Sequence, residues 1–210
     1  MKRKLLMPLI YVLGLAAILA FAAINQAPSE PVQLTPTRTS PMSLPPDFRE
    51  TYVQYLVVER VDAVVRYAYI QPEALENLQR GEPLPIGTQI IIEAYHAQRN
   101  IAGQVRRDDD NRFIPDEIFP TIHAAEKRSE WSREDIASST RLNGWNFETF
   151  DSQTLEPAFE NRNDCFVCHD TSAFRHDFIF TRNIIDDFIS NNEDVQYFYC
   201  NRPDRSPCRL

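Results

Sequence analysis

A short run near the C-terminus, CFVCH (Cys165–His169), combines two thiols and an imidazole at a spacing that can do chemistry. In a Cys-x-x-Cys-His run the two thiols can add to the vinyl groups of a haem, and the histidine can then ligate the iron. The run therefore predicts one covalently attached haem c, bound by Cys165, Cys168 and His169, with His169 as the metal ligand. The sequence assigns no catalytic residue.

Three other uses of the cysteine pair are weighed against haem attachment. A zinc site needs further ligands, but the sequence has no second Cys-x-x-Cys, and His96, His123 and His176 are not spaced as a partner pair. A thioredoxin-like redox pair follows a strand, and the residues before Cys165 do not resemble one. A structural disulfide across two residues is the third alternative. Haem attachment is favoured over all three.

The second axial position of the iron is narrowed by composition. Electron-transfer cytochromes of the c type often place a methionine opposite the histidine. The methionines of this chain are Met1, Met7 and Met42. None lies in the expected folded domain, so a His/Met carrier is disfavoured. Ligation by a second histidine remains an alternative, and five-coordinate iron with an open distal site is expected.

The N-terminus reads as a targeting segment (residues 1–24). A basic start, MKRK, precedes the uncharged apolar run Leu5–Ile24, which is long enough to span a bilayer. A cleaved signal peptide and an N-terminal membrane anchor both remain open. The basic flank places the rest of the chain outside the cytoplasm. We expect a periplasmic or other extracytoplasmic protein, tethered to the inner membrane by this segment.

A linker rich in Pro, Ser and Thr (residues 25–47) follows, and then one domain (residues 48–190). The chain has 22 basic and 30 acidic residues, a net charge of −8. This balance disfavours nucleic acid as a partner and suits a basic redox partner protein.

The C-terminal tail (residues 191–210) contains the other two cysteines, Cys200 and Cys208. They flank a short loop with two prolines. Since an exported protein can keep disulfides, we expect these two cysteines to form a bridge.

The motif must be positioned by the elements of the domain. Periodicity and turn residues predict helices and strands in the order helix, strand, helix, strand, strand, haem motif, helix. This order indicates an α+β fold with a mainly antiparallel sheet and a few helices. The expected helices lie within 44–61, 72–81 and 177–189, and the strands within 63–72, 82–97 and 144–152.

Four segments, taken in order, are similar to the cytochrome P-460 and cytochrome c′-beta family. The likeness spans residues 44–189, about two-thirds of the chain. It implies a mainly β fold, often as a homodimer, with His169 as proximal ligand and an aromatic-rich distal pocket. The segments are LPPDFRETYVQY (44–55), YIQPEALENLQRGEPLPIGTQIIIEAY (69–95), GWNFETFD (144–151) and CFVCHDTSAFRHDFIFT (165–181).

Two activities occur in that family. Its P-460 members oxidise hydroxylamine and carry a lysine cross-linked to the haem, whereas its c′-beta members bind nitric oxide without the cross-link. The alignment places Ile92 at the cross-link position, and Lys127, the only lysine beyond the N-terminal segment, is expected to be exposed. The resemblance thus favours binding of nitric oxide or a related small nitrogen species, with slow oxidoreductase activity as an additional expectation. Bis-histidine electron transfer and hydroxylamine oxidation are the alternatives.

The same segments suggest how the distal side is built. Ile90, Ile92 and Phe147 are expected to form a dry wall that favours neutral diatomic ligands. Glu93 is a candidate acid or base there, although a surface or structural place for it is favoured. Among the histidines, His96 and His123 are the candidates for a second iron ligand.

Overall fold

A computed structural model describes residues 42–131, 142–158, 162–172 and 176–202. The expected targeting segment, residues 25–41 of the expected linker, and Cys208 lie outside these residues. In the part of the chain that is described, no helix is long and apolar enough to cross a membrane.

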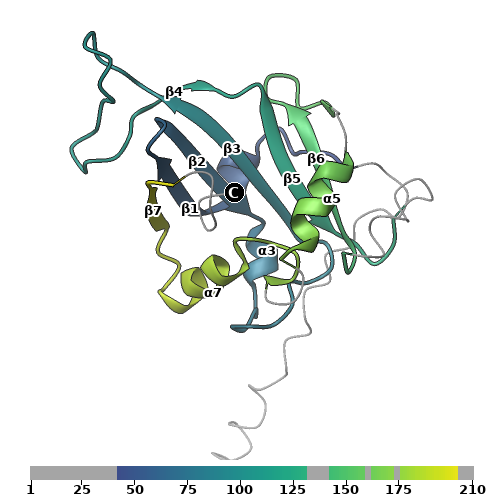
Figure 1. The fold of residues 1–210 in the computed structure, drawn as a ribbon. Coiled ribbons are helices and arrows are strands. Elements are labelled where there is room, and N and C mark those ends of the chain that lie inside the picture. The colour runs from purple at the N-terminus through teal and green to yellow at the C-terminus, as the bar shows by residue number, and fades with distance from the viewer. Residues whose placement is uncertain (1–41, 132–141, 159–161, 173–175, 203–210) are drawn as a thin grey trace, which may run out of the picture. The chain divides into compact units, whose positions relative to one another are not determined.

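A seven-stranded, mainly antiparallel sheet forms the centre of the fold (Figure 1). Its strand order is β6-β5-β3-β2-β1-β7, and β4 pairs with β3 beside this path. The edge strand β7 is the exception, because it runs parallel to β1. The strands are β1 (Val53–Arg60), β2 (Val64–Ile70), β3 (Gln89–Ala97), β4 (Pro115–Ile118), β5 (Thr121–Lys127), β6 (Trp145–Asp151) and β7 (Gln196–Cys200).

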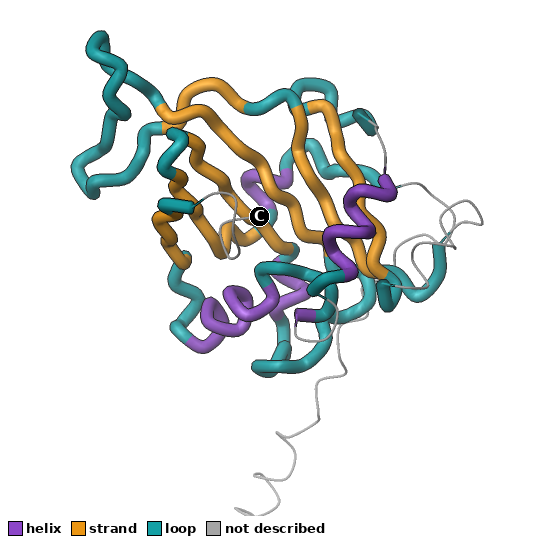
Figure 2. Tube along the Cα trace, in the orientation of Figure 1, coloured by secondary structure: helices purple, strands orange, loops and turns teal. Residues whose placement is uncertain are grey.

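Helices cover both faces of this sheet (Figure 2). On one face, α5 (Arg162–Asp170) packs on β6 and α7 (Arg182–Ser190) packs on β1. The short α3 (Pro72–Leu75) contributes to the same core, and α2 (Phe48–Thr51) packs on the opposite face. The expected α+β fold with a mainly antiparallel sheet is confirmed.

The central strand β3 contributes apolar side chains to both faces of the sheet. Ile90 and Ile92 join the core beneath α5 and α7, whereas Ile91 packs with Phe48 on the α2 face. Successive side chains of a strand point to opposite faces, so a strand covered on both sides needs apolar residues at consecutive positions. The run of three isoleucines is therefore explained by burial on both sides.

The expected helix over residues 44–61 is wrong for most of its length. Only Phe48–Thr51 is helical, and β1 begins at Val53. Tyr55, Leu56, Val57 and Val58 are all buried, between 0% and 5% exposed. Two covered faces favour this run of aromatic and β-branched residues as a strand, which overrides the helical spacing.

The other expected elements are present with shifted ends. The strands within 63–72, 82–97 and 144–152 are confirmed as β2, β3 and β6. The helix within 72–81 is reduced to α3, and the C-terminal helix is confirmed as α7, with Ile184, Ile185 and Phe188 buried. Strands β4, β5 and β7 were not anticipated, and β7 pairs with a strand some 140 residues earlier.

Gly144 is required by the turn that leads into β6. Its φ is +87°, in the left-handed region, and a Cβ added there would collide with the carbonyl oxygen of Arg128. The same close approach lets the N–H of Arg128 donate to the carbonyl of Gly144 at 3.0 Å.

We therefore expect Gly144→Ala to lower the free energy of unfolding by more than the about 1–2 kcal/mol that a left-handed L-residue costs. Gly103→Ala is the control, because Gly103 has a similar φ of +78° and nothing within 4 Å of the added Cβ. Urea denaturation measures both variants. Equal losses would show that the Arg128 contact does not matter.

Candidate functional site

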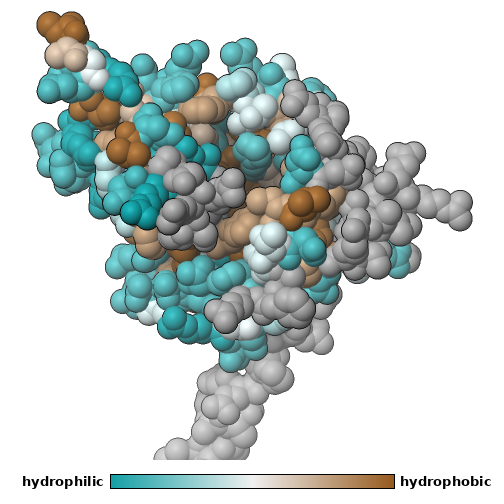
Figure 3. All heavy atoms as spheres, in the orientation of Figure 1, coloured by the Kyte–Doolittle hydropathy of each residue, from teal (hydrophilic) through white to brown (hydrophobic). Residues whose placement is uncertain are grey.

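A cavity of about 420 Å³ lies on the face of the sheet that α5 covers. Its walls come from strands β2, β3, β5 and β6, from α5, and from residues 179–181 before α7. Apolar side chains gather in a hollow at the centre of this face (Figure 3). The volume falls within the ~300–1,000 Å³ typical of cofactor and ligand sites.

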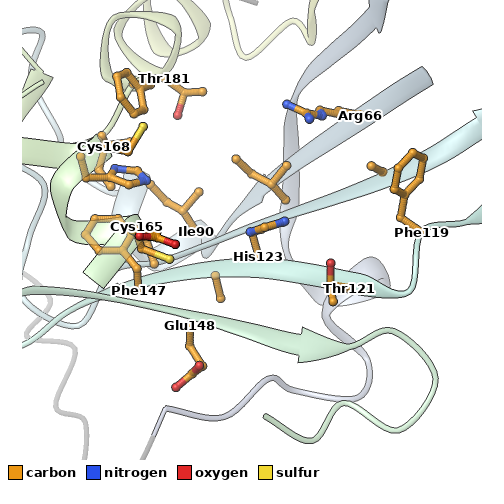
Figure 4. Close-up of a pocket in the computed structure, with 18 residues that line it drawn as sticks. Arg66, Ile90, Phe119, Thr121, His123, Phe147, Glu148, Cys165, Cys168 and Thr181 are labelled. Carbon is orange, nitrogen blue, oxygen red and sulfur yellow. The ribbon is translucent and has the colours of Figure 1, made fainter. Parts of the chain in front are cut away.

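Helix α5 brings the predicted cofactor-binding residues together at the cavity. Cys168 and His169 follow Cys165 by three and four positions, so the three residues share one side of the helix, and all three line the cavity. Figure 4 labels the two cysteines. Both cysteines are free thiols. Burial raises the pKa of the Cys165 thiol, which keeps it protonated. This donor set in a largely apolar cavity fits a haem held by two thioether bonds and one imidazole.

The imidazole of His169 is oriented by a backbone carbonyl. Its Nδ1 lies 2.6 Å from the carbonyl oxygen of Phe178. A carbonyl only accepts hydrogen bonds, so Nδ1 carries the proton and Nε2 keeps its lone pair. Burial lowers the pKa of His169 to about 4, although the hydrogen bond to Phe178 opposes the shift. The ring is therefore neutral at neutral pH, which is the form that ligates a metal.

Two aromatic rings pack against this imidazole. The ring of Phe147 stacks on His169, with centroids 3.8 Å apart and an interplanar angle of 26°, and the ring of Phe180 lies 5.0 Å away. Phe147 lines the cavity as expected, but it lies against His169 and not on a separate distal wall. Ile90 and Ile92 line the cavity as expected.

The segment before α7 supplies a second set of contacts. Ile179, Phe180 and Thr181 all line the cavity, next to the carbonyl of Phe178. The hydroxyls of Thr181 and Tyr55 share a buried hydrogen bond of 2.7 Å. This bond ties the cavity wall to the core of β1.

Arg66 on β2 is a cavity residue that the sequence interpretation missed. It lies at the opposite end of the cavity from the two cysteines (Figure 4), and its Nη1 is buried with no hydrogen-bond partner in the structure. Burial lowers the pKa of Arg66 to about 10, with Arg60 contributing, so the guanidinium stays charged at neutral pH. The sequence contained a signal for this position, because Arg66 is a charged residue on the same strand face as the apolar Ala68 and Ile70.

His123 on β5 is the candidate second ligand that the fold brings to the cavity. It lines the cavity and pairs across the sheet with Ile92. The His123 side chain is exposed to solvent through the cavity. The protein that surrounds the rest of the ring still desolvates it, which lowers the pKa of His123. His96 does not line the cavity, and its ring instead stacks on Phe119 at 4.4 Å. His176 does not line it either.

The structure contradicts the expectation for Lys127 and agrees with the one for Glu93. Lys127 was expected to be exposed, which is wrong: it is 3% exposed at the end of β5, and its Nζ lies 2.7 Å from Oδ2 of Asp177. Its burial follows from the β5 strand that the sequence interpretation missed. Glu93 has the structural place that was favoured, because it faces away from the cavity, 1% exposed, and accepts a hydrogen bond from Tyr69.

Met42 and Cys200 are the remaining residues for which the sequence made a prediction. Met42 is buried in the cluster on the α2 face, away from the cavity. Cys200 is disulfide-bonded. Its predicted partner, Cys208, lies outside the described residues, so the pairing itself stays a prediction.

The fold and the cavity fit the class of haem proteins in which a β-sheet, and not a helical bundle, builds the cofactor cavity. The family model for Cytochrome P460 matches residues 45–181, and the chain belongs to the cytochrome P460 family. No curated protein matches the chain. Membership implies a haem cofactor and fits a protein that acts on small nitrogen species.

The buried hydrogen bond between Tyr55 and Thr181 gives a test of how the cavity wall is held. We expect Tyr55→Phe to cost about 1–3 kcal/mol of unfolding free energy, because it leaves the Thr181 hydroxyl without its partner. Adding Thr181→Val should recover most of that loss, since an apolar pair of the same shape leaves nothing unsatisfied. Urea denaturation of the two single variants and the double variant checks this. Additive losses would contradict it.

Proposed function

We propose that this protein is an exported c-type cytochrome with one haem, which binds nitric oxide or a related small nitrogen species. Cys165 and Cys168 would hold the haem through thioether bonds, and Nε2 of His169 would be the proximal iron ligand. The distal side would stay open for the ligand. The apolar N-terminal segment would place the domain in the periplasm, tethered to the inner membrane or released after cleavage.

One observation supports this proposal more than any other: the cavity has an oriented imidazole at the end with the two thiols and a half-buried arginine at the other end. When bound, haem supplies an iron atom that can coordinate a small ligand. The chain supplies a fixed neutral histidine, apolar walls from Ile90 and Ile92, and a cationic hydrogen-bond donor, Arg66.

Arg66 narrows the chemical class of ligand that the cavity would bind. A buried guanidinium nitrogen without a partner is costly, and it gains most from an acceptor that carries negative charge. The wall was expected to favour neutral diatomic ligands, and the isoleucines agree with that. Arg66 adds a preference for ligands with a negative or partly negative oxygen, such as nitrite or the polarised form of a bound nitrogen oxide.

The cavity favours the c′-beta type of activity over cross-linked hydroxylamine oxidation. Ile92 lines the cavity where the resemblance places the cross-linking lysine. Lys127 does not line the cavity, and its ammonium group is engaged with Asp177. Hydroxylamine turnover in this chain would have to proceed without the family's lysine–haem bond.

Bis-histidine electron transfer is kept as the second candidate, because His123 lines the same cavity as His169. A second imidazole bound to the iron would close the distal site. The proposed function therefore requires that a small ligand can bind the iron, whereas the second candidate requires a closed distal site.

The absorption spectrum of the purified ferrous holoprotein separates these functions. We expect a high-spin, five-coordinate spectrum that changes on adding nitric oxide, and haem-peptide mass spectrometry should show attachment only at Cys165 and Cys168. A low-spin resting spectrum that becomes high-spin in His123→Ala would instead establish the second candidate. His96→Ala is the control, because His96 lies outside the cavity.

Arg66→Met tests the proposed donor, because it removes the guanidinium group and keeps an unbranched side chain. A hydrogen bond to a charged group contributes about 1.5–3 kcal/mol, so we expect nitrite to bind roughly 10- to 100-fold more weakly. Carbon monoxide, a neutral ligand, should lose much less. Arg80→Met is the matched control, because Arg80 is exposed and pairs with Asp187. Equal losses for nitrite and carbon monoxide would show that Arg66 acts by shape alone.

A further inference from the structure

Lys127 is the only lysine beyond the N-terminal segment, and the site described above does not use it. It ends strand β5 with its side chain 4% exposed. Its Nζ lies 2.7 Å from Oδ2 of Asp177, whose side chain is 12% exposed, and 5.6 Å from the centre of the Trp145 ring. A buried ammonium group of this kind is fixed in place by its carboxylate partner.

Asp177 is held from three separate parts of the chain. Besides Lys127, the backbone N–H of Leu84 donates to its Oδ2 at 3.3 Å, and the side-chain amide of Asn143 donates to its Oδ1 at 3.3 Å. Both carboxylate oxygens are thus engaged. The position of Asp177 is set relative to β5, to the loop before β3 and to the turn before β6.

The backbone at Asp177 has an unusual form. Asp177 and Phe178 both have left-handed φ angles, +48° and +63°. Such a pair does not persist without external support, and least of all at a bulky aromatic residue. The carbonyl of Phe178 belongs to this left-handed turn, and it accepts the hydrogen bond from Nδ1 of His169.

We propose that Lys127, acting through Asp177, is a positioning residue for His169. The chain of contacts runs from the ammonium group to the carboxylate, through the left-handed turn to the Phe178 carbonyl, and from there to the imidazole. This inference rests on the proximal role of His169 in the proposed function. It assigns to Lys127 a role at the haem that needs no bond to the haem.

The expected consequence is electronic as well as geometric. The partner on the second ring nitrogen of a ligating histidine fixes the ring and raises its basicity as a ligand. A carbonyl held at 2.6 Å should keep the imidazole electron-rich. Loosening the turn should weaken the hydrogen bond, and with it the bond between iron and Nε2.

Resonance Raman spectroscopy of the ferrous holoprotein measures that bond through the iron–histidine stretching band. We expect Lys127→Met and the milder Asp177→Asn to move the band to lower frequency and to make the midpoint potential more positive. Lys127→Arg, which keeps the positive charge, should return the band toward its original position.

The matched control is Glu126→Gln. Glu126 and Arg128 also form a buried ion pair, with side chains 7% and 6% exposed, but Glu126 faces the opposite side of the sheet from its neighbour Lys127. This variant should lose stability without moving the band.

The outcomes separate the two claims. A band that is present and unshifted in Lys127→Met and Asp177→Asn would overturn the positioning role and leave the proposed function intact. If the unaltered protein showed no iron–histidine band in its five-coordinate ferrous form, the proximal role of His169 would be wrong, and the proposed function with it. A shift as large in Glu126→Gln as in Lys127→Met would show a general loss of structure and would also overturn the positioning role.

Discussion

The hydrogen bond from Nδ1 of His169 to the carbonyl of Phe178 is the interaction on which the site depends. It joins α5 to the turn before α7, and both segments pack on the same face of the sheet. It also decides which nitrogen faces the cavity, since the carbonyl requires a proton on Nδ1. Stacking by Phe147 and burial of the ring then keep one orientation and one charge state.

Two buried carboxylates, Glu93 and Glu126, lie on the side of the sheet away from the cavity. On the α2 face, Glu93 is satisfied by Tyr69 and Arg49, and Glu126 by Arg128, so these buried carboxylates are neutralised away from the cavity. The cavity face instead carries Arg66, whose Nη1 is buried without a hydrogen-bond partner in the structure. The alternation of side chains along a strand lets neighbouring residues serve these two environments. A shift of one residue in register would exchange them.

The sequence could predict the parts that depend on short spacing. The cofactor-binding residues on α5, the isoleucine wall of β3 and the helix stripe of α7 all follow from periods of a few residues. It could not predict what depends on distant pairing. The strand nature of β1 comes from cover on both faces, β7 pairs with it from the far end of the domain, and the places of Arg66, His123 and Lys127 follow from register across β2, β3 and β5. Local pattern carries no information on register of that kind.

The turn at Asp177 and Phe178 shows why a buried ion pair is kept where an apolar pair could stand. Each left-handed residue costs about 1–2 kcal/mol, so the turn as a whole opposes folding by about 2–4 kcal/mol. Removing one partner of a buried ion pair costs about 3–5 kcal/mol, because the other charge is then left buried and unpaired. Replacing both charges with apolar side chains could leave the stability unchanged. It would nevertheless remove the directional contact, and the carbonyl that orients His169 would then be free to follow the relaxed backbone. In this fold the Lys127–Asp177 pair contributes geometry more than stability.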